Sequence, residues 1–443
     1  MSKSSEKTEK LKEPKREIGL RDLVFLSLGG QSPFLSVLVY GLLAFEEGGY
    51  FAPIAVILGT LLVLINGLVV YRLSTKFTQE GGYYLYAYYS LTKRLGFETG
   101  WTYLLYSSFY GVAYALGASF VLSEILSINP FMILSIILGI SSTLALLGKK
   151  PSFRYAIFAS VLEIFMLSFI AGSFLYTTKF TFYNPFVKIP PLDQVALAIV
   201  FGSSIPTGYG SITPLSGEVK DPKKTVPRAI ITVILLGGLL AAFDIYSIID
   251  HIIYFHISIT NIDLIHLIEY RFGLLTLAFV LFAAANDGVL ATLTYIFSTS
   301  RTIFAMAYHD FLPAILAKLT EKNEPFYAVS VAVASYWIIS FIATVISGFN
   351  LANAFALVGL ISLFANLYVH LAADFSLFKI SLKRARKRIL QLALSISAVI
   401  VTLVIFSASV GGTVPLTLDI FLLWLIAGFL IAEIIDMSKE EED

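Results

Sequence analysis

The sequence predicts an all-α membrane protein with twelve transmembrane helices, and three observations support this prediction. Of its 443 residues, 57% are hydrophobic and only 14% are charged, whereas soluble proteins contain roughly 25% charged residues. A soluble domain of this length cannot bury so many apolar side chains, because its surface still grows with its mass. Apolar stretches of about 20 residues, the length that crosses a bilayer core, recur along the whole chain.

Twelve such stretches follow one another and define the expected spans. They are residues 22–44, 51–73, 98–126, 131–148, 153–177, 193–213, 229–249, 273–305, 326–347, 351–372, 389–409 and 416–436. We expect an N-terminal tail, two groups of five spans, two further spans and a C-terminal tail, at residues 1–21, 22–177, 193–372, 389–436 and 437–443.

The basic residues predict the orientation. Twelve spans place both termini on one side of the membrane, and all but three of the 31 lysines and arginines fall on that side. The exceptions are Lys179, Lys188 and Arg271. Because lysine and arginine concentrate in cytoplasmic loops, we expect a multi-pass protein of the cell membrane with both termini in the cytoplasm.

The composition argues against several other classes of protein. A net charge of +1 offers no basic surface for nucleic acid. The chain has no cysteine, which excludes disulfides and thiolate metal sites, and its five histidines are scattered. It has neither a Ser/His/Asp set nor a His-Glu-x-x-His motif at membrane depth. We therefore expect no enzyme activity, no cofactor, no bound metal and no nucleic-acid partner.

Two spans contain residues that interrupt helices. The first span contains Gly29-Gly30-Gln31-Ser32-Pro33, whose Ser-Pro pair suits the start of a second half-helix. The sixth contains Phe201-Gly202-Ser203-Ser204-Ile205-Pro206-Thr207-Gly208-Tyr209-Gly210-Ser211. Glycine and proline can simply kink a transmembrane helix. These two spans, however, open two five-helix halves of opposite topology, and interruptions at matching positions of inverted halves indicate a transporter binding site.

Three further segments resemble the amino acid–polyamine–organocation (APC) superfamily of transporters. They are Glu80-Gly81-Gly82-Tyr83-Tyr84-Leu85-Tyr86, the loop Gly217-Glu218-Val219-Lys220-Asp221-Pro222-Lys223-Lys224-Thr225-Val226-Pro227-Arg228-Ala229-Ile230, and Ser300-Arg301 followed by Asp310-Phe311-Leu312-Pro313. The resemblance implies an amino acid permease with the leucine-transporter-type fold, in which five plus five inverted helices include broken helices 1 and 6. It also implies secondary active transport by alternating access.

The chain departs from the family pattern at three places. The first break reads Gly30-Gln31-Ser32-Pro33-Phe34, where the family commonly has Gly-x-Gly-Ile-Phe. The sixth span reads Gly208-Tyr209-Gly210, where the family has an acidic third residue, and Gly217 replaces the first glutamate of the loop. These differences bear on the substrate and on gating rather than on the fold.

A half-helix N-terminus attracts an anion and freed carbonyls attract an ammonium group, so an amino acid suits the two breaks. We expect the substrate carboxylate to be bound by Gly29, Gly30, Gln31 and Ser32. The amine is expected at the carbonyls of Phe201, Gly202 and Ser203. The side-chain pocket is expected to be shaped by Ser204, Ile205 and Gly208.

Two carboxylates are expected near the middle of the membrane. Glu163 lies about 15 Å above the start of the fifth span, and Asp287 lies about 21 Å from Arg301, at 1.5 Å per residue. Because buried carboxyls are rare in lipid, we hypothesise that they exchange the coupling proton; the alternative is a structural hydrogen-bonded pair. Sodium coupling through Thr292 and Thr294 is the less favoured alternative.

The loop after the sixth span also contains two candidate gate residues. Glu218 and Arg228 flank the cytoplasmic loop and are expected to hold an inner gate.

A transporter of polyamines or other organic amines, or an amino acid exchanger, is the alternative within the same fold. The missing acidic residue at Gly210 argues against polyamines. A channel or sensor on the same scaffold is the alternative from a different class.

Overall fold

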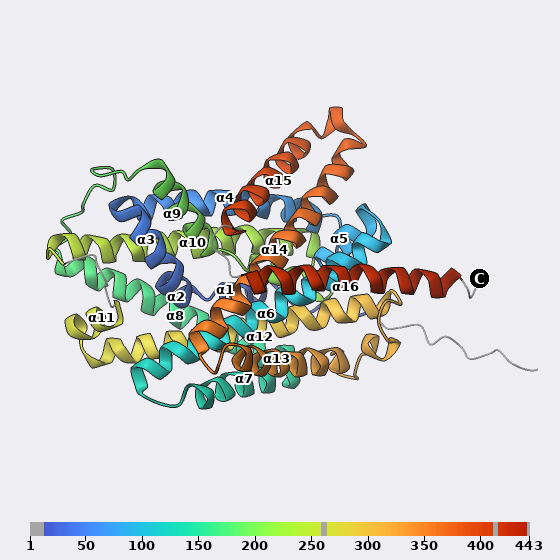
Figure 1. Cartoon of the computed structure of the whole chain (residues 1–443), viewed down its shortest axis with the longest axis horizontal. Coiled ribbons are helices and arrows are strands. Elements are labelled where there is room, and N and C mark those ends of the chain that lie inside the picture. The colour runs from blue at the N-terminus through green and yellow to red at the C-terminus, as the bar shows by residue number, and fades with distance from the viewer. Residues whose placement is uncertain (1–12, 258–263, 411–414, 441–443) are drawn as a thin grey trace, which may run out of the picture.

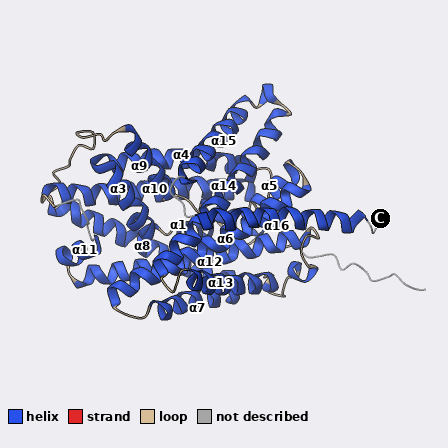
Figure 2. Ribbon diagram, in the orientation of Figure 1, coloured by secondary structure: helices blue, strands red, loops and turns tan. Residues whose placement is uncertain are grey.

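The computed structural model describes residues 13–257, 264–410 and 415–440. Helices account for nearly all of this part of the chain, and loops for the rest (Figure 2). Extended backbone pairing within it is confined to an isolated parallel bridge between Ile18 and Val219. The predicted all-α membrane class is confirmed.

The first 55 residues of the bundle form several consecutive helices. They are α1 (Leu20–Gln31), α2 (Pro33–Ser36), the π-helix η1 (Val37–Gly41), α3 (Leu42–Gly48), the 3₁₀-helix η2 (Gly49–Phe51) and α4 (Ala52–Ser74). The rest of the first half contains α5 (Tyr83–Ser90), α6 (Lys93–Leu126), α7 (Pro130–Leu147) and α8 (Lys149–Thr177).

The second half begins with α9 (Leu192–Ser204) and the 3₁₀-helix η3 (Tyr209–Glu218). It continues with α10 (Pro222–Tyr254), α11 (Leu264–Phe272), α12 (Leu274–Tyr308), η4 (Ala314–Ala317), α13 (Phe326–Ile346) and α14 (Leu351–Leu382). The last elements are η5 (Ala385–Lys387), α15 (Ile389–Val410) and α16 (Pro415–Glu440).

In the described part of the chain, eleven segments are long and apolar enough to cross a membrane. The first of them, Leu20–Ser74, contains two predicted spans, 22–44 and 51–73. The total of twelve spans therefore stays a prediction. The other helices begin or end up to ten residues beyond the predicted spans, as at the C-terminal end of α14. The reason is that hydropathy marks only the lipid-embedded part of a helix.

Helix α1 lies inside the bundle, where it packs against α8, α10 and α12 (Figure 1). Helices α6, α12 and α14 pack together on one side of it, and α4 packs between α9 and α10. A side chain at Gly59 of α4 or at Gly202 of α9 would collide with the backbone of the other helix. These glycines therefore let α4 hold the end of α9 beside α1. Helices α15 and α16 pack on the outside, against α14, α4 and α6.

Candidate functional site

The first predicted break lies between α1 and α2. Ser32 separates the two helices with a left-handed φ of 49°, and Pro33 is the first residue of α2. A serine rarely adopts this conformation, because the left-handed region costs a non-glycine residue about 1–2 kcal/mol. The new helix start leaves the N–H groups of its first turn without partners in the same helix.

Two carboxyl groups bind these N–H groups. Phe34 N donates to Glu163 Oε1 at 3.3 Å, and Leu35 N donates to Asp287 Oδ2 at 2.7 Å. Both side chains are buried, one on α8 and the other on α12. The structure thus brings together the two carboxylates that the sequence located by depth. It also gives them the environment that a helix N-terminus provides for anions.

Further polar side chains orient this carboxyl pair. Asn286 Nδ2 donates to Glu163 Oε2, and Tyr155 OH donates to Asn286 Oδ1 at 3.1 Å. Asp287 Oδ1 has no hydrogen-bond partner. No lysine or arginine of the described residues forms a salt bridge with either carboxyl. The pair is therefore held by neutral donors alone.

The second predicted break follows α9 and contacts the first directly. Helix α9 ends at Ser204, a turn covers residues 205–208, and η3 continues as a 3₁₀-helix. Gln31 Nε2 donates to the Pro206 carbonyl at 2.9 Å. Gly208 has a φ of 93°, and a Cβ atom there would lie 2.6 Å from the Gly30 carbonyl oxygen. Only glycine fits this close backbone approach.

The residues predicted to bind substrate line these two breaks, but several of their hydroxyls are already used. Ser203 Oγ and Ser204 Oγ both donate to the Val200 carbonyl, at 2.7 and 3.3 Å. Ser32 Oγ donates to the Gly29 carbonyl at 3.4 Å. Such bonds back to the same segment are common for serine in membrane helices. The binding roles of the predicted residues stay predictions.

A set of tyrosines that sequence reasoning did not assign to the site faces the breaks. On α6, Tyr114 OH lies 3.0 Å from Ser36 Oγ, and Tyr110 OH lies 3.4 Å from Thr207 Oγ1. Tyr106 OH lies 2.7 Å from the hydroxyl of Tyr295 on α12. A signal was present in the sequence, because three α6 tyrosines spaced four residues apart lie on one face of a helix.

A cavity of about 330 Å³ adjoins the first break on the side of the bundle away from the termini. Its walls come from α2, η1, α6, α11 and α14, and they are almost entirely apolar. Tyr114 lies both on this cavity and against Ser36 in α2. Tyr114 thus connects the wall of this cavity to the first break.

On the side of the termini, a buried salt-bridge network closes the bundle. Glu218 pairs with Arg301 Nε at 2.7 Å and with Lys149 Nζ at 3.0 Å. Glu324 pairs with Arg301 Nη2 at 3.0 Å. The N-terminal segment covers this network, because Ile18 N donates to the Glu218 carbonyl at 2.9 Å. This network and the N-terminal segment thus tie α8, η3 and α12 together on that side.

The sequence identified only part of this closure. Glu218 was predicted as a gate residue, whereas Lys149, Arg301 and Glu324 were not. Arg228, the predicted second gate residue, is exposed on α10, and none of the salt bridges among the described residues includes it. Its role in a gate stays a prediction.

Glu80 lies beside this network, in the connection between α4 and α5. Its carboxyl packs closely against Gly217, so that a side chain at position 217 would require the carboxyl of Glu80 to move. Burial, and next the nearby Glu218, raise the pKa of Glu80 to about 8. Gly217 is the position where the resembling family has a glutamate, so a carboxyl group occupies this place from a different element.

The two threonines considered for sodium coupling bond to neighbouring helices. Thr292 Oγ1 donates to the Gly111 carbonyl at 3.0 Å, and Thr294 Oγ1 donates to the Leu26 carbonyl at 2.9 Å. Both hydroxyls thus have a packing role in the structure.

A family model described as amino acid permease matches residues 22–437. The chain belongs to the amino acid permease family. The resemblance to APC transporters is thereby confirmed. Membership places this multi-pass membrane protein among transporters rather than enzymes.

Individual relatives of this permease are distant and match over part of their length. The low-affinity putrescine importer PlaP of Escherichia coli strain K12 is 23% identical over 53% of this chain and 54% of its own. The serine/threonine exchanger SteT of Bacillus subtilis strain 168 is 28% identical over 53% and 54%. Human solute carrier family 7 member 13 is 26% identical over 55% of each chain. The permease spans about half the length of these relatives.

Solved structures share the fold of this permease. A mutant of the Eremococcus coleocola manganese transporter superposes with a TM-score of 0.56 over 98% of this chain and 99% of that chain, at 14% identity. A second mutant of the same transporter gives a TM-score of 0.54 over the same shares. At such low identity, the similarity concerns the fold alone.

Proposed function

We propose that this permease is a secondary active amino acid transporter that works by alternating access and is coupled to protons. The observation that supports this most directly is the capping of the first break by Glu163 and Asp287, at 3.3 and 2.7 Å. This arrangement joins a titratable pair to the break that is expected to hold the substrate carboxylate.

The coupling follows from the chemistry of the pair. Two carboxylates on neighbouring N–H groups repel each other unless one of them holds a proton. A substrate carboxylate that arrives at Gly29, Gly30, Gln31 and Ser32 adds a third negative charge. Its binding therefore favours uptake of a proton by Glu163 or Asp287. Binding of the proton and of the substrate reinforce each other, as reciprocal linkage requires.

The amine end of the substrate is assigned to the other break. The C-terminal end of α9 carries a partial negative charge and presents its last carbonyls. The carbonyls of Phe201, Gly202 and Ser203 belong to this end. The side chain of the substrate then lies beside Ser204, Ile205 and Gly208.

The outward-facing and inward-facing states of the proposed cycle differ in which side of the bundle is open. With both termini in the cytoplasm, the apolar cavity faces outward and the network around Glu218 closes the cytoplasmic side. Transport then requires the cavity to close and this network to open. In this proposal, the arrangement in the structure is the state that receives substrate from outside.

The decisive experiment is uptake into liposomes that contain the purified permease. The panel holds the twenty amino acids, with and without an inward proton gradient. We expect saturable uptake of at least one amino acid, increased by the gradient. Absence of uptake and of exchange across the whole panel contradicts amino acid transport.

Two conservative variants test the coupling pair. Glu163→Gln and Asp287→Asn keep the shape and remove the titration, so gradient-driven accumulation should fall by about tenfold or more. Glu98→Gln is a matched control, because Glu98 is a buried carboxyl of α6 that packs against Gly428 of α16, away from the break. If one of the two variants keeps full gradient-driven uptake, that residue has no part in coupling.

An organic amine transporter is the second candidate, because one relative is named as a putrescine importer. Adding putrescine to the panel separates the two substrate classes. Counterflow, in which unlabelled substrate inside accelerates uptake of labelled substrate, separates a carrier or exchanger from a channel.

A further inference from the structure

Asp244 is one of the buried carboxyls that lie outside the site described above. Asp244 on α10 is 4% exposed, and neither of its carboxyl oxygens has a hydrogen-bond partner. Unpaired buried carboxylates are costly in a membrane protein. Glu98 on α6 is also buried and unpaired, and Asp244 is singled out here because it borders a cavity. Nearby Asp250 on the same helix shows the contrast, since it accepts bonds from Thr178 Oγ1 at 2.6 Å and Tyr183 N at 3.0 Å.

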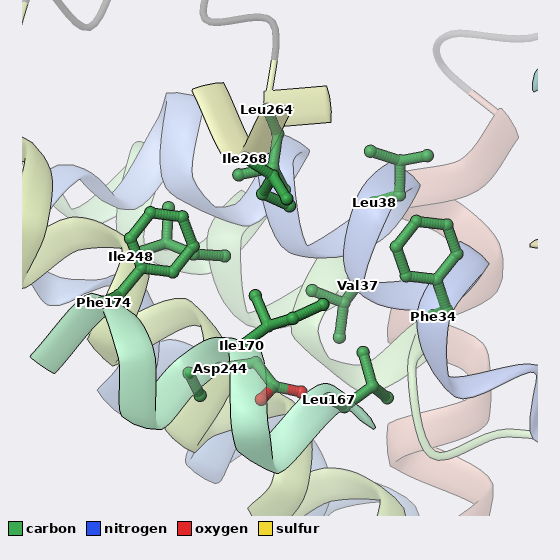
Figure 3. A pocket seen from close by; sticks show the side chains of 11 residues that line it. Phe34, Val37, Leu38, Leu167, Ile170, Phe174, Asp244, Ile248, Leu264 and Ile268 are labelled. Atoms are coloured by element: carbon green, nitrogen blue, oxygen red, sulfur yellow. The ribbon is translucent and has the colours of Figure 1, made fainter. Parts of the chain in front are cut away.

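Asp244 borders a small cavity between α2, η1, α8, α10 and α11. Figure 3 shows its carboxyl group among aliphatic and aromatic side chains, close to Ile170 and Leu167 of α8. The other ten lining residues are all hydrophobic. The cavity measures about 30 Å³, which is room for one or two water molecules and too little for an amino acid. Asp244 is the lining residue with a polar side chain that can hold such water.

This cavity adjoins the carboxyl pair at the first break. Phe34 lines the cavity with its ring, while its N–H binds Glu163 Oε1. Leu167, another lining residue, follows Glu163 by one turn on α8. Phe34 and Leu167 therefore lie between the cavity and the carboxyl pair.

Another titratable group lies behind Phe174, one of the residues that line the cavity. His251 follows Asp244 by two turns on α10, and its ring lies 5.0 Å from that of Phe174, which lines the cavity. His251 Nδ1 bonds to Thr177 Oγ1 at 2.6 Å, and its buried Nε2 has no partner. Arg271 stacks on Phe255, next to His251. Glu163 and Asp287 thus lie beyond one wall of the cavity, and His251, Asp250 and Arg271 lie beyond another, while Asp244 is the titratable group among the lining residues.

We propose that Asp244 is a proton-relay residue and that this cavity is the route by which protons reach Glu163 and Asp287 from the side away from the termini. A proton passes from an acid in outside water, by way of His251, to a carboxyl oxygen of Asp244. It then moves through cavity water to the pair, and at each step the bond from the proton to the donor oxygen, or to His251 Nε2, breaks as the bond to the acceptor forms. The inference rests on the proposed proton coupling and adds a residue and a path to it.

The test uses the permease in liposomes and the amino acid of the panel that the unaltered protein takes up fastest. Two rates are compared: accumulation driven by a proton gradient, and counterflow without a gradient. Asp244→Asn should lower gradient-driven accumulation by about tenfold or more and leave counterflow within about twofold. Asp244→Glu should restore most of the driven accumulation.

A stability measurement separates the relay from a structural role. Asp244→Leu removes an unpaired polar group from an apolar site, so the melting temperature in detergent should stay equal or rise. A relay predicts that this stable variant nevertheless loses driven accumulation. A fall of several degrees in the melting temperature would instead assign Asp244 to structure.

The remaining outcomes are distinct. If the unaltered permease transports but ignores the gradient, both the proton coupling and the relay are wrong. If it is coupled and Asp244→Asn remains fully coupled, the relay alone is wrong. A raised half-saturating concentration with unchanged gradient dependence would also overturn the relay, because Asp244 would then contact substrate.

Discussion

Glu80 combines a raised pKa with a place beside the salt-bridge network of Glu218, so that its protonation changes at moderate pH. Burial and the nearby Glu218 raise its pKa to about 8, above the ordinary value of 4.5. The folded state therefore holds a proton that the unfolded state releases between these two pH values. Stability contributed by this proton is complete below pH 4.5 and is lost as pH rises through 8.

The corresponding prediction concerns Glu80→Gln. The variant lacks this titration, so its melting temperature should fall less than that of the unaltered permease between pH 5 and pH 9. We expect a difference of a few degrees, measured by thermal unfolding in detergent. Glu321→Gln is the control, because Glu321 is exposed. Glu324→Gln is unsuitable because it removes a member of the salt-bridge network. Parallel pH profiles of Glu80→Gln and the unaltered protein would contradict the prediction.

The sequence predicted the place of an individual residue where its position along one helix was sufficient information. Glu163 and Asp287 were located because the helical rise converts sequence position into membrane depth. Arg301 and Lys149 were not, since pairing with Glu218 depends on how three distant segments meet. Arg301 is also fully buried, although an arginine at the end of an apolar run normally indicates the membrane surface.

At the scale of elements, the contact between the two breaks depends on Gly208. Its φ is 93°, and a Cβ atom added there would lie only 2.6 Å from the Gly30 carbonyl oxygen, which leaves no room for a side chain. Gly208→Ala should therefore push the breaks apart. The left-handed backbone alone costs about 1–2 kcal/mol, and the collision involves a backbone oxygen that has no rotamer to adopt.

We expect Gly208→Ala to lower transport by about tenfold or more and to lower the melting temperature. Gly139→Ala is the matched control, because a Cβ atom at Gly139 of α7 meets nothing within 4 Å. That change should be neutral or slightly stabilising, since alanine favours helices. Uptake in liposomes and thermal unfolding measure both effects. Equal uptake and equal melting temperatures of the two variants would show that the close contact of the breaks matters for neither transport nor stability.

Long helices were predictable because apolar length identifies them, while short elements were not. The sequence predicted neither α5 nor α11, and it did not indicate that η3 runs as a 3₁₀-helix for ten residues. Long 3₁₀-helices are uncommon and depend on their surroundings. Here η3 packs against α1, α10 and α12, and these contacts exist only in the folded bundle. Glycine and proline indicated where helices end but not which elements would meet there.

For the whole molecule, the proposed transport cycle depends on an apolar cavity and a buried salt-bridge network on opposite sides of the breaks. Glu218, Lys149, Arg301 and Glu324 join η3, α8, α12 and the segment before α13. Removing one member of a buried ion network leaves its partners as uncompensated charges and costs several kcal/mol. The closed state should lose stability relative to a state in which water reaches these groups.

Arg301→Gln should therefore open the side of the termini, and the absence of cysteine from the sequence makes this measurable. Thr213→Cys places a single thiol in η3, where the side chain is buried. A membrane-impermeant maleimide applied from the side of the termini should label it slowly in the otherwise unaltered permease. Labelling should be at least about tenfold faster when Arg301→Gln is added, because the accessible state is more populated.

Two controls separate opening of the gate from general loss of structure. Lys322→Cys, at an exposed position on the same side, should be labelled equally in both backgrounds. Arg301→Lys keeps the charge and should label Thr213→Cys at an intermediate rate, since a lysine cannot reproduce both guanidinium contacts. Retained thermal unfolding cooperativity shows that the variants are folded. If the buried thiol stays protected in a folded Arg301→Gln variant, the network has a packing role and is not the gate. The closure of this side then has to be assigned to the N-terminal segment that binds the Glu218 carbonyl.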